Sequence, residues 1–205
     1  AGGNHTCAVD NYSTPWCWGY GSHGQLGLTN SNNWYYPGSV DNITTATSVS
    51  TGGNHSCAVL SGGTVNCWGY GSYGQLGNGS SGSNASSSTP VSVTGISTAN
   101  SVSAGHNHTC AVLDNGTVKC WGYGAYGQLG SGYNSSVSTP VSVTGISTAS
   151  SVSAGEAHTC AVLDNGTIKC WGYGNYGQLG NSQTTNQYSP VSVSGISNAT
   201  SVSAG

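Results

Sequence analysis

Short runs of apolar and small polar residues recur along the chain, and each has the length of a β-strand. Residues 101–104 alternate small polar with apolar side chains, and residues 109–113 and 117–121 flank an Asp-Asn-Gly turn. Asp114-Asn115-Gly116 suits a hairpin connection, because glycine can take the left-handed position of a bulge. A fourth run, 140–143, starts with a proline, which suits the first residue or the edge of a sheet. No segment has helical periodicity, so the pattern predicts an all-β chain.

This pattern occurs four times. The first cysteines of successive copies are 50, 53 and 50 residues apart, and the extra three residues fall in the loop after Gly77. Periods near 50 residues with several strands each are typical of propeller blades or stacked β units. We expect one continuous repeat domain with units at 1–50, 51–103, 104–153 and 154–205.

Each unit carries two cysteines ten residues apart. In a hairpin centred on Asn115, Cys110 and Cys120 face each other within disulfide reach. Zinc sites, the alternative, usually space two cysteines by two to four residues. We therefore expect structural disulfides, and with them an oxidising compartment and a secreted or cell-surface protein. The expected pairs are Cys7-Cys17, Cys57-Cys67, Cys110-Cys120 and Cys160-Cys170.

A glycine-rich loop, 122–130, follows each hairpin and is matched at 19–27, 69–77 and 172–180. Four glycines in such a loop imply positive φ angles or close backbone contact. A phosphate-binding loop would need a following helix and a placed lysine, and neither is present. Packing between adjacent units is the preferred interpretation.

Charge is scarce in this chain. Only 3% of the residues are charged, and two lysines stand against five acids. Nucleic-acid binding depends on lysine and arginine meeting phosphates, so we expect no nucleic-acid partner, and anionic membranes are disfavoured for the same reason. No apolar run approaches the ~20 residues of a membrane span. An initiator methionine and a signal peptide are both missing, which predicts a mature product or a segment of a longer chain.

The repeated residues resemble a known family. The series Ala-Gly-x-x-His-Thr-Cys-Ala-Val, Asp-x-Gly-Thr-Val-x-Cys-Trp-Gly, Gly-x-x-x-x-Gly-Gln-Leu-Gly and Thr-Pro-Val is similar to the repeat of the regulator of chromosome condensation (RCC1) family, over the whole chain. The paired cysteines resemble those of secreted bacterial members. The resemblance implies four-stranded antiparallel blades, in a β-propeller of usually about seven blades.

Function transfers less readily than fold. The family's eukaryotic founder exchanges nucleotide on a small GTPase and binds chromatin through blade loops and a basic tail, and other members bind and inhibit β-lactamases or act as scaffolds. The founder's charged elements have no counterpart in this sequence. Ala1-Gly2 and Ala204-Gly205 occupy the same phase of the repeat, so we expect a whole number of units from a longer periodic object. A four-bladed ring, a piece of a larger ring and an open array that meets the next copy remain possible.

Several polar and aromatic residues are candidate functional residues, and most of them recur in every unit. His5, His55, His108 and His158 each precede a cysteine but have no matching acid or nucleophile, so we expect each to bond a neighbouring unit's backbone. Trp18, Trp68, Trp121 and Trp171 are expected in the core or between blades. The loop tyrosines at 20, 70, 73, 123, 126, 173 and 176 are expected to cover the adjacent unit. Trp34, Tyr35 and Tyr36 occur only in the first unit and are the candidate contact for a specific partner.

Sequons for N-glycosylation are abundant: chance predicts about five, and eleven are present. They cluster at hairpin tips, before the repeated histidine and in the loop after Gln-Leu-Gly, where exposure would permit modification. The candidates are Asn4, Asn11, Asn42, Asn54, Asn78, Asn84, Asn107, Asn115, Asn134, Asn165 and Asn198.

These features favour an extracellular structural protein, a disulfide-stapled and glycosylated blade array that joins copies of itself head to tail into a fibre or surface coat. The alternative is a fragment of a secreted propeller that binds a protein or glycan. An enzyme has the least support, because no non-repeated cluster of acid, base and nucleophile is visible. We expect no catalytic residues, no metal and no cofactor.

Overall fold

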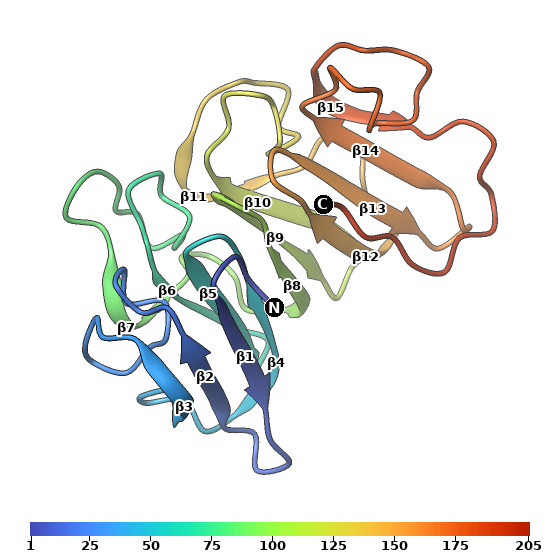
Figure 1. Cartoon of the computed structure of the whole chain (residues 1–205). Helices are drawn as coiled ribbons and strands as arrows, with labels where there is room; N and C mark the ends of the chain where they lie inside the picture. Colours follow the sequence, from blue (N-terminus) through green and yellow to red (C-terminus); the bar gives the residue numbers. More distant parts are fainter.

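The computed structural model describes all 205 residues, and it contains fifteen strands and no helix. The strands form four antiparallel sheets, blades 1 to 4, which stand side by side in an open arc (Figure 1). The all-β prediction is therefore confirmed, and the four blades form an arc that does not close into a ring.

Each blade is a meander in which consecutive strands pair. Blade 1 contains β1 (His5–Val9), β2 (Pro15–Gly19) and β3 (Trp34–Ser39). Blade 2 contains β4 (Ala46–Thr51), β5 (His55–Leu60), β6 (Val65–Gly69) and β7 (Ser87–Ser92). Blade 3 contains β8 (Ala99–Ala104), β9 (His108–Leu113), β10 (Val118–Gly122) and β11 (Val137–Ser142). Blade 4 contains β12 (Ala149–Ala154), β13 (His158–Leu163), β14 (Ile168–Gly172) and β15 (Gln187–Ser192).

The central hairpin of each blade forms as its sequence predicts. In blade 3, Leu113 and Thr117 close the turn with a hydrogen bond of 2.9 Å, and Gly116 takes φ +74°. Because the register pairs Cys110 with Cys120, the two Cα atoms lie 4.1 Å apart and a disulfide joins them. The other three hairpins hold the equivalent disulfides, and no cysteine is free.

The outer strand differs from its expected boundaries. In blade 3 it begins at Val137, so Pro140 lies inside β11 rather than at its first position. The pairing of β11 with β10 is interrupted by a bulge between Cys120 and Gly122, opposite the proline. An edge strand tolerates the missing N–H there, because its outer side has no ladder partner to lose.

The sheets are out of phase with the sequence units. Strand β4 spans the boundary expected at residue 50, yet it pairs with β5 of the following unit. Innermost strands therefore come from the end of one unit, and blade 1, whose β1 has no such partner, has three strands. Residues 201–205 lie beyond β12 in the place of another innermost strand: the Ala204 N–H donates to Ser153 Oγ at 3.0 Å, as that of Ala154 does to Ser103 Oγ.

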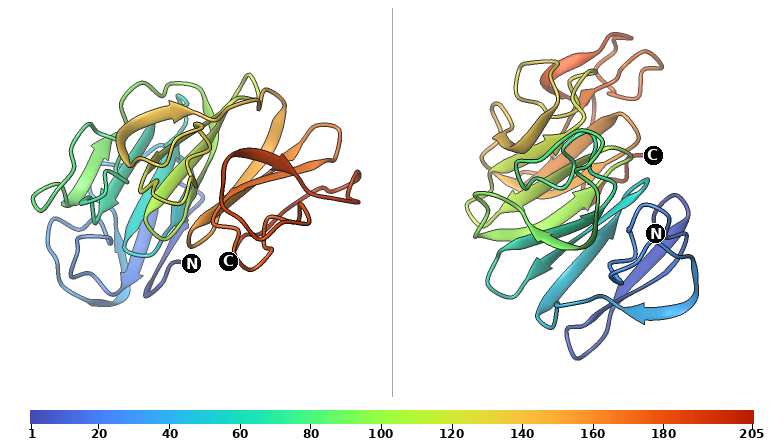
Figure 2. Two further views of the ribbon diagram at one scale, coloured as in Figure 1. Left: turned by 90° about the horizontal axis from the view of Figure 1, so that it is seen from above. Right: turned by 90° about the vertical axis from the view of Figure 1, so that its left-hand side faces the viewer.

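The core lies between blades. One cluster joins Val59 and Val65 of blade 2 to Ala111 and Trp121 of blade 3, and corresponding clusters lie at the other contacts. Figure 2 shows the sheets fanning out from the side on which both termini lie. A single blade buries little by itself, so each blade depends on its neighbours for a core.

Candidate functional site

The same contact recurs between each pair of adjacent blades, and we call it the joint. It is built from a histidine and a loop glutamine of one blade, and from a hydroxyl residue and a tryptophan of the next. The three joints are His5, Gln25, Ser56 and Trp68; His55, Gln75, Thr109 and Trp121; and His108, Gln128, Thr159 and Trp171.

Hydrogen bonds cross the joint in both directions, and together they fix which atom is the donor in each. Between blades 2 and 3, the Thr109 hydroxyl donates to the Gln75 carbonyl at 3.0 Å and lies 2.8 Å from His55 Nε2. A hydroxyl has one proton, so the imidazole must be the donor in the second bond. The hydrogen-bond pattern thus assigns the proton to Nε2, and it leaves Nδ1 of His55 buried without a partner. The Gln75 carbonyl also accepts from the Trp121 indole at 2.9 Å.

Burial keeps these imidazoles neutral. It lowers the pKa of His55 and of His108 to about 3, with nearby histidines adding to the effect, and the pKa of His5 to about 4, with the N-terminal charge adding there. A second proton would sit on Nδ1, where no acceptor is available. The pKa of His158 is also lowered by burial. His5, His55 and His108 therefore act as neutral donors between blades.

The glycine-rich loop fits against the next blade because it lacks side chains at two points. A Cβ on Gly77 would lie 2.7 Å from Nε1 of Trp121, and a Cβ on Gly74 would lie 2.6 Å from Cα of Ser138. Both glycines have positive φ angles, +70° and +83°. Packing between adjacent units, as predicted for this loop, is confirmed.

Sequence reasoning placed the histidines at the joint but missed their acceptor. We expected a bond to a neighbouring backbone, whereas Nε2 bonds a hydroxyl side chain, and the backbone carbonyl is reached through that hydroxyl. The residue after each histidine is Thr or Ser in every unit, and the Gln of Gly-Gln-Leu-Gly is also invariant within the chain. Because these residues recur at the same positions of every unit, their spacing could have predicted the pair of bonds from histidine to hydroxyl and from hydroxyl to the glutamine carbonyl, which we call the relay.

The loop tyrosines form a continuous row across all four blades. The row runs Tyr20, His23, Tyr70, Tyr73, Tyr123, Tyr126, Tyr173, Tyr176, with successive ring centroids 5.0–6.0 Å apart in edge-to-face geometry. Burial and the neighbouring rings raise the pKa of Tyr123 in the middle of the row. Tyr73 and Tyr126 contact a ring of the next unit, as predicted for the loop tyrosines. In the first unit His23 makes this contact, which was not predicted from the sequence. The edges of Tyr73, Tyr126 and Tyr176 remain exposed.

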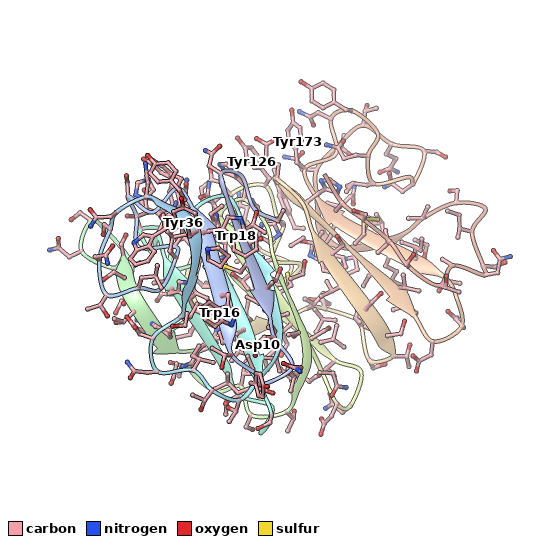
Figure 3. All side chains as sticks on the ribbon, turned by 60° about the horizontal axis from the view of Figure 1, so that its bottom comes forward. Asp10, Trp16, Trp18, Tyr36, Tyr126 and Tyr173 are labelled. Carbon is pink, nitrogen blue, oxygen red and sulfur yellow. A yellow bond between two sulfur atoms is a disulfide. The ribbon has the colours of Figure 1, made fainter.

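The two outer blades present halves of the joint with nothing against them. The indole of Trp18 is only half-buried, whereas Trp68, Trp121 and Trp171 are fully buried. Thr6 is half-buried and, like Trp18, makes no side-chain hydrogen bond. At the opposite face, His158 is half-buried, and Gly177 has open space where Gly74 meets Ser138. Trp18 lies on blade 1 in Figure 3.

The remaining candidates lie on the surface. Trp34, Tyr35 and Tyr36 of β3 are 39%, 87% and 79% exposed, which leaves them available to a partner. None of the sequon asparagines is buried. Asn54, Asn78 and Asn107 are half-buried, and the exposed ones are Asn4, Asn11, Asn42, Asn84, Asn115, Asn134, Asn165 and Asn198.

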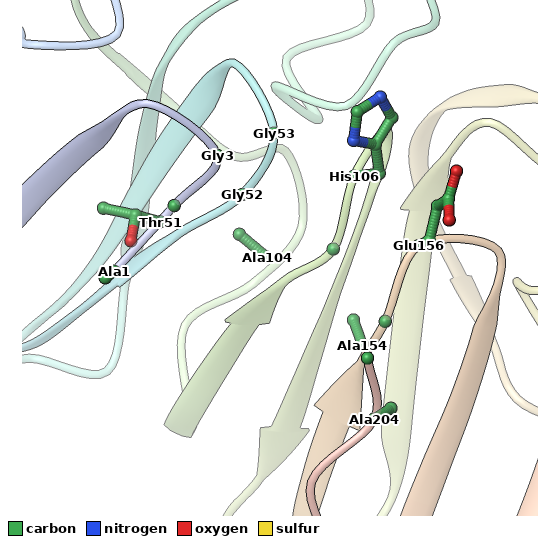
Figure 4. A pocket seen from close by; sticks show the side chains of 14 residues that line it. Ala1, Gly3, Thr51, Gly52, Gly53, Ala104, His106, Ala154, Glu156 and Ala204 are labelled. Carbon is green, nitrogen blue, oxygen red and sulfur yellow. The ribbon is translucent and has the colours of Figure 1, made fainter. Parts of the chain in front are cut away.

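A hollow on the inner side of the arc has a volume of about 420 Å³ (Figure 4). Backbone and small side chains from all four blades line it, and His106 and Glu156 are its only titratable side chains. No group of three or more His, Cys, Asp or Glu residues could hold a metal ion. No helix that could cross a membrane is present. The joint and the aromatic row are thus the main organised features.

Comparisons with known proteins agree with this architecture. The Regulator of chromosome condensation (RCC1) repeat model matches residues 16–59, 62–112, 115–162 and 165–205, and a second RCC1 repeat model matches within 46–178. No curated protein matches the sequence.

Solved structures share the fold. Human WBSCR16 superimposes with a TM-score of 0.89 at 23% identity, covering 100% of this chain and 54% of its own. Yeast RCC1 (Prp20), solved bound to Kap60, superimposes with a TM-score of 0.82 at 20% identity, and the match covers 93% of this chain and 46% of the yeast protein. The ectodomain of the Physcomitrella patens receptor kinase CR4 superimposes with a TM-score of 0.56 at 25% identity, and the match covers 98% of this chain and 45% of the ectodomain. The chain thus spans about half the length of these proteins, and by its four repeat matches it belongs to the RCC1 repeat family.

Proposed function

We propose that this chain is a non-enzymatic extracellular structural protein whose blades propagate by head-to-tail contact between copies into a fibre or surface coat. The observation that carries the proposal is the complementarity of its two open faces. Blade 1 presents the hydroxyl and indole half of a joint, and blade 4 presents the histidine and glutamine half. These are the halves that meet in all three internal joints.

The internal joints specify the expected contact between copies. His158 Nε2 of one copy would donate to the Thr6 hydroxyl of the next, and that hydroxyl and the Trp18 indole would both donate to the Gln178 carbonyl. Residues 201–204 would pair with the open edge of β1. Internal registers pair Ala104 with Thr109 and Ala154 with Thr159, so the proposed register pairs Ala204 with Thr6. An unpaired strand edge is a template for such addition.

Surface chemistry supports an extracellular setting. The four disulfides fit a secreted or extracellular protein. All eleven sequon asparagines are exposed or half-buried, so attached glycans can extend into solvent. Glycans would supply the solubility that a chain with 3% charged residues lacks. We propose that several sequons are occupied, with Asn115 and Asn165 at exposed hairpin tips the leading candidates.

Assembly is tested by imaging and mass measurement of the purified protein over a concentration series. We expect filaments that lengthen with concentration, because a head-to-tail contact that does not close on itself grows without limit. Trp18→Ala should abolish assembly. The matched control is Tyr12→Ala, since Tyr12 is an exposed aromatic of the same blade and lies outside the joint.

Three outcomes contradict a fibre built through this joint. Wild-type protein that stays monomeric at high concentration would remove the head-to-tail contact altogether. Closed rings of two copies would retain the joint but exclude the filament. Assembly that persists in the Trp18→Ala variant would show that another surface joins the copies.

Compartment and modification are tested on native material by mass analysis. We expect a mass above that of the polypeptide that falls on enzymatic release of N-glycans, and no free thiol without reduction. An unmodified mass would remove the glycan proposal, and eight free thiols would remove the extracellular one.

The exposed aromatic group on β3 supports a secondary role in binding a protein or glycan partner. Trp34, Tyr35 and Tyr36 lie next to one another on an edge strand. Tyr35 is matched by the exposed Tyr188 of β15, whereas Trp34 and Tyr36 have no aromatic counterpart in the other blades. Replacing Tyr35 and Tyr36 by serine should leave assembly unchanged and reduce retention of any partner co-purified with native material. Unchanged retention would exclude this surface.

A further inference from the structure

A hollow of about 330 Å³ lies at one point on the aromatic row, bounded by three tyrosines, a glutamate and an alanine: Tyr126, Tyr173, Tyr176, Glu156 and Ala157. The Tyr126 and Tyr173 rings are inclined by 64° with centroids 5.2 Å apart, and those of Tyr173 and Tyr176 by 72° at 5.8 Å. The walls of the hollow therefore consist of steeply inclined aromatic rings. Tyr126 and Tyr173 are neighbours in Figure 3.

Backbone contacts hold these walls in place. The Tyr173 N–H donates to the Ala157 carbonyl at 2.9 Å, which fixes the rim against the aromatic row. The N–H groups of Tyr126 and Tyr176 donate to the side-chain oxygens of Gln128 and Gln178, both at 3.0 Å. The rings are thus carried on restrained loops, which favours a preformed site.

The other blades lack this combination. At the position of Ala157, blades 1, 2 and 3 have Asn4, Asn54 and Asn107; at the position of Glu156 they have Gly3, Gly53 and His106. Alanine is smaller than asparagine and has no side-chain amide. Blade 4 alone therefore combines a smaller side chain with a carboxylate at this point.

Charge at the hollow is negative. Glu156 is exposed and forms no salt bridge, and the two lysines, Lys119 and Lys169, lie on the central strands β10 and β14. Figure 4 shows the Glu156 carboxylate directed away from the inner strands, on the side to which His106 also points. A carboxylate beside several aromatic rings attracts a cation twice, through its own charge and through the negative ring faces.

We propose that this hollow binds a small soluble cation carrying a trimethylammonium group. Aromatic rings hold such a group over their faces, and the methyl groups require apolar contact that a hydrated metal ion does not offer. The Glu156 carboxylate supplies the counter-charge. The site lies where blades 3 and 4 meet, so it exists in the isolated chain and does not depend on assembly between copies.

The test measures binding of choline to the monomeric protein by calorimetry or by chemical shifts of the tyrosine rings. The matched ligand is 3,3-dimethylbutan-1-ol, which has the shape of choline without its charge. We expect choline to bind about tenfold or more tightly than the neutral compound. Added salt should weaken choline binding, because Glu156 is exposed.

Variants separate the contributions to binding. Glu156→Gln should weaken choline binding about tenfold and leave binding of the neutral compound unchanged. Tyr176→Phe should retain binding because the ring remains, whereas Tyr176→Leu should lose most of it. The double variant Glu156→His with Ala157→Asn reproduces the blade 3 sequence, so it should fold normally and lose the site.

Several outcomes overturn the proposal. These are the absence of saturable choline binding to the folded protein, equal affinity for choline and the neutral compound, and full retention of binding in the double variant. Loss of binding in Tyr176→Phe would also contradict it, because it would assign recognition to the phenol hydroxyl.

Discussion

The joint between blades 2 and 3 and the open face of blade 4 contain the same residue types in different surroundings. His55 is fully buried and bonded to Thr109 of the next blade, whereas His158 is half-buried and has no hydroxyl partner. Tyr73, at the joint, is 40% exposed, and Tyr176, at the open face, is 85% exposed. A residue's role in this molecule is therefore set by the blade beside it.

This difference follows from how the core is distributed. Each hydrophobic cluster that crosses a joint takes residues from two blades, so a face without a neighbour loses half of its contacts. Stability in such arrays is approximately a sum of unit terms and neighbour terms. The same substitution made at an internal blade and at an outer blade therefore measures the stability that a neighbouring blade contributes. All free energies of unfolding are to be measured at concentrations where the protein is monomeric.

Acidification should produce the largest effect. The folded pKa values of His5, His55 and His108, about 4, 3 and 3, lie below the unfolded value of about 6.5. Between these values the unfolded chain binds more protons, so stability falls as pH decreases from 6.5 toward 4. Three protons correspond to at most about 4 kcal/mol per pH unit.

Urea unfolding at several pH values measures this slope. Replacing His108 by asparagine should reduce the slope by about one proton, and the same change at the half-buried His158 should reduce it less. Stability independent of pH between 7 and 4 would contradict neutral burial of the joint histidines.

Tryptophan truncation should separate the internal joint from the open face. Trp121→Ala should cost about 3–5 kcal/mol, because it leaves a cavity and removes a bond to the Gln75 carbonyl. Trp18→Ala, at the uncovered face, should cost about 1 kcal/mol or less. The free energies of unfolding of the two variants measure the difference, and equal losses would show that blade 1 is stabilised differently.

Adding one methyl group tests the fit of the glycine-rich loop. Gly74→Ala would place Cβ 2.6 Å from the backbone of Ser138, whereas Gly177→Ala meets nothing within 4 Å. Both alanines pay about 1–2 kcal/mol for the left-handed conformation, and Gly74→Ala should lose about 1–3 kcal/mol more through overpacking. Thermal unfolding would reveal this, and similar melting temperatures would argue against tight packing at Gly74.

Removing a single hydroxyl should give the smallest effect. Thr109→Val leaves the His55 Nε2 proton buried without an acceptor and should cost about 1–3 kcal/mol. Thr6→Val should be nearly neutral, because that hydroxyl has no partner in the chain. The midpoints of urea unfolding of the two variants measure this difference in stability. An unchanged midpoint for Thr109→Val would mean that the relay adds no stability.

Much of the fold could be predicted because its determinants are local. Turn residues such as Asn115 and Gly116 fix the hairpin, and the hairpin register fixes the disulfide between Cys110 and Cys120. The limits of the outer strand differ from the prediction because they depend on a bulge opposite Trp121, between the pairs Cys120–Val141 and Gly122–Val137. That bulge arises between strands and leaves no local pattern in the sequence.

The sequence by itself determined the repeat, the all-β class and the family, since these depend on residue identity at fixed spacing. Only the tertiary structure decided which units share a sheet, which hydroxyl receives the histidine proton and which tyrosines surround Glu156. Those contacts join residues about 17 to 54 positions apart, and no local rule of chain geometry relates such residues. They exist because apolar faces of neighbouring blades must be buried together, which is a property of the assembled array.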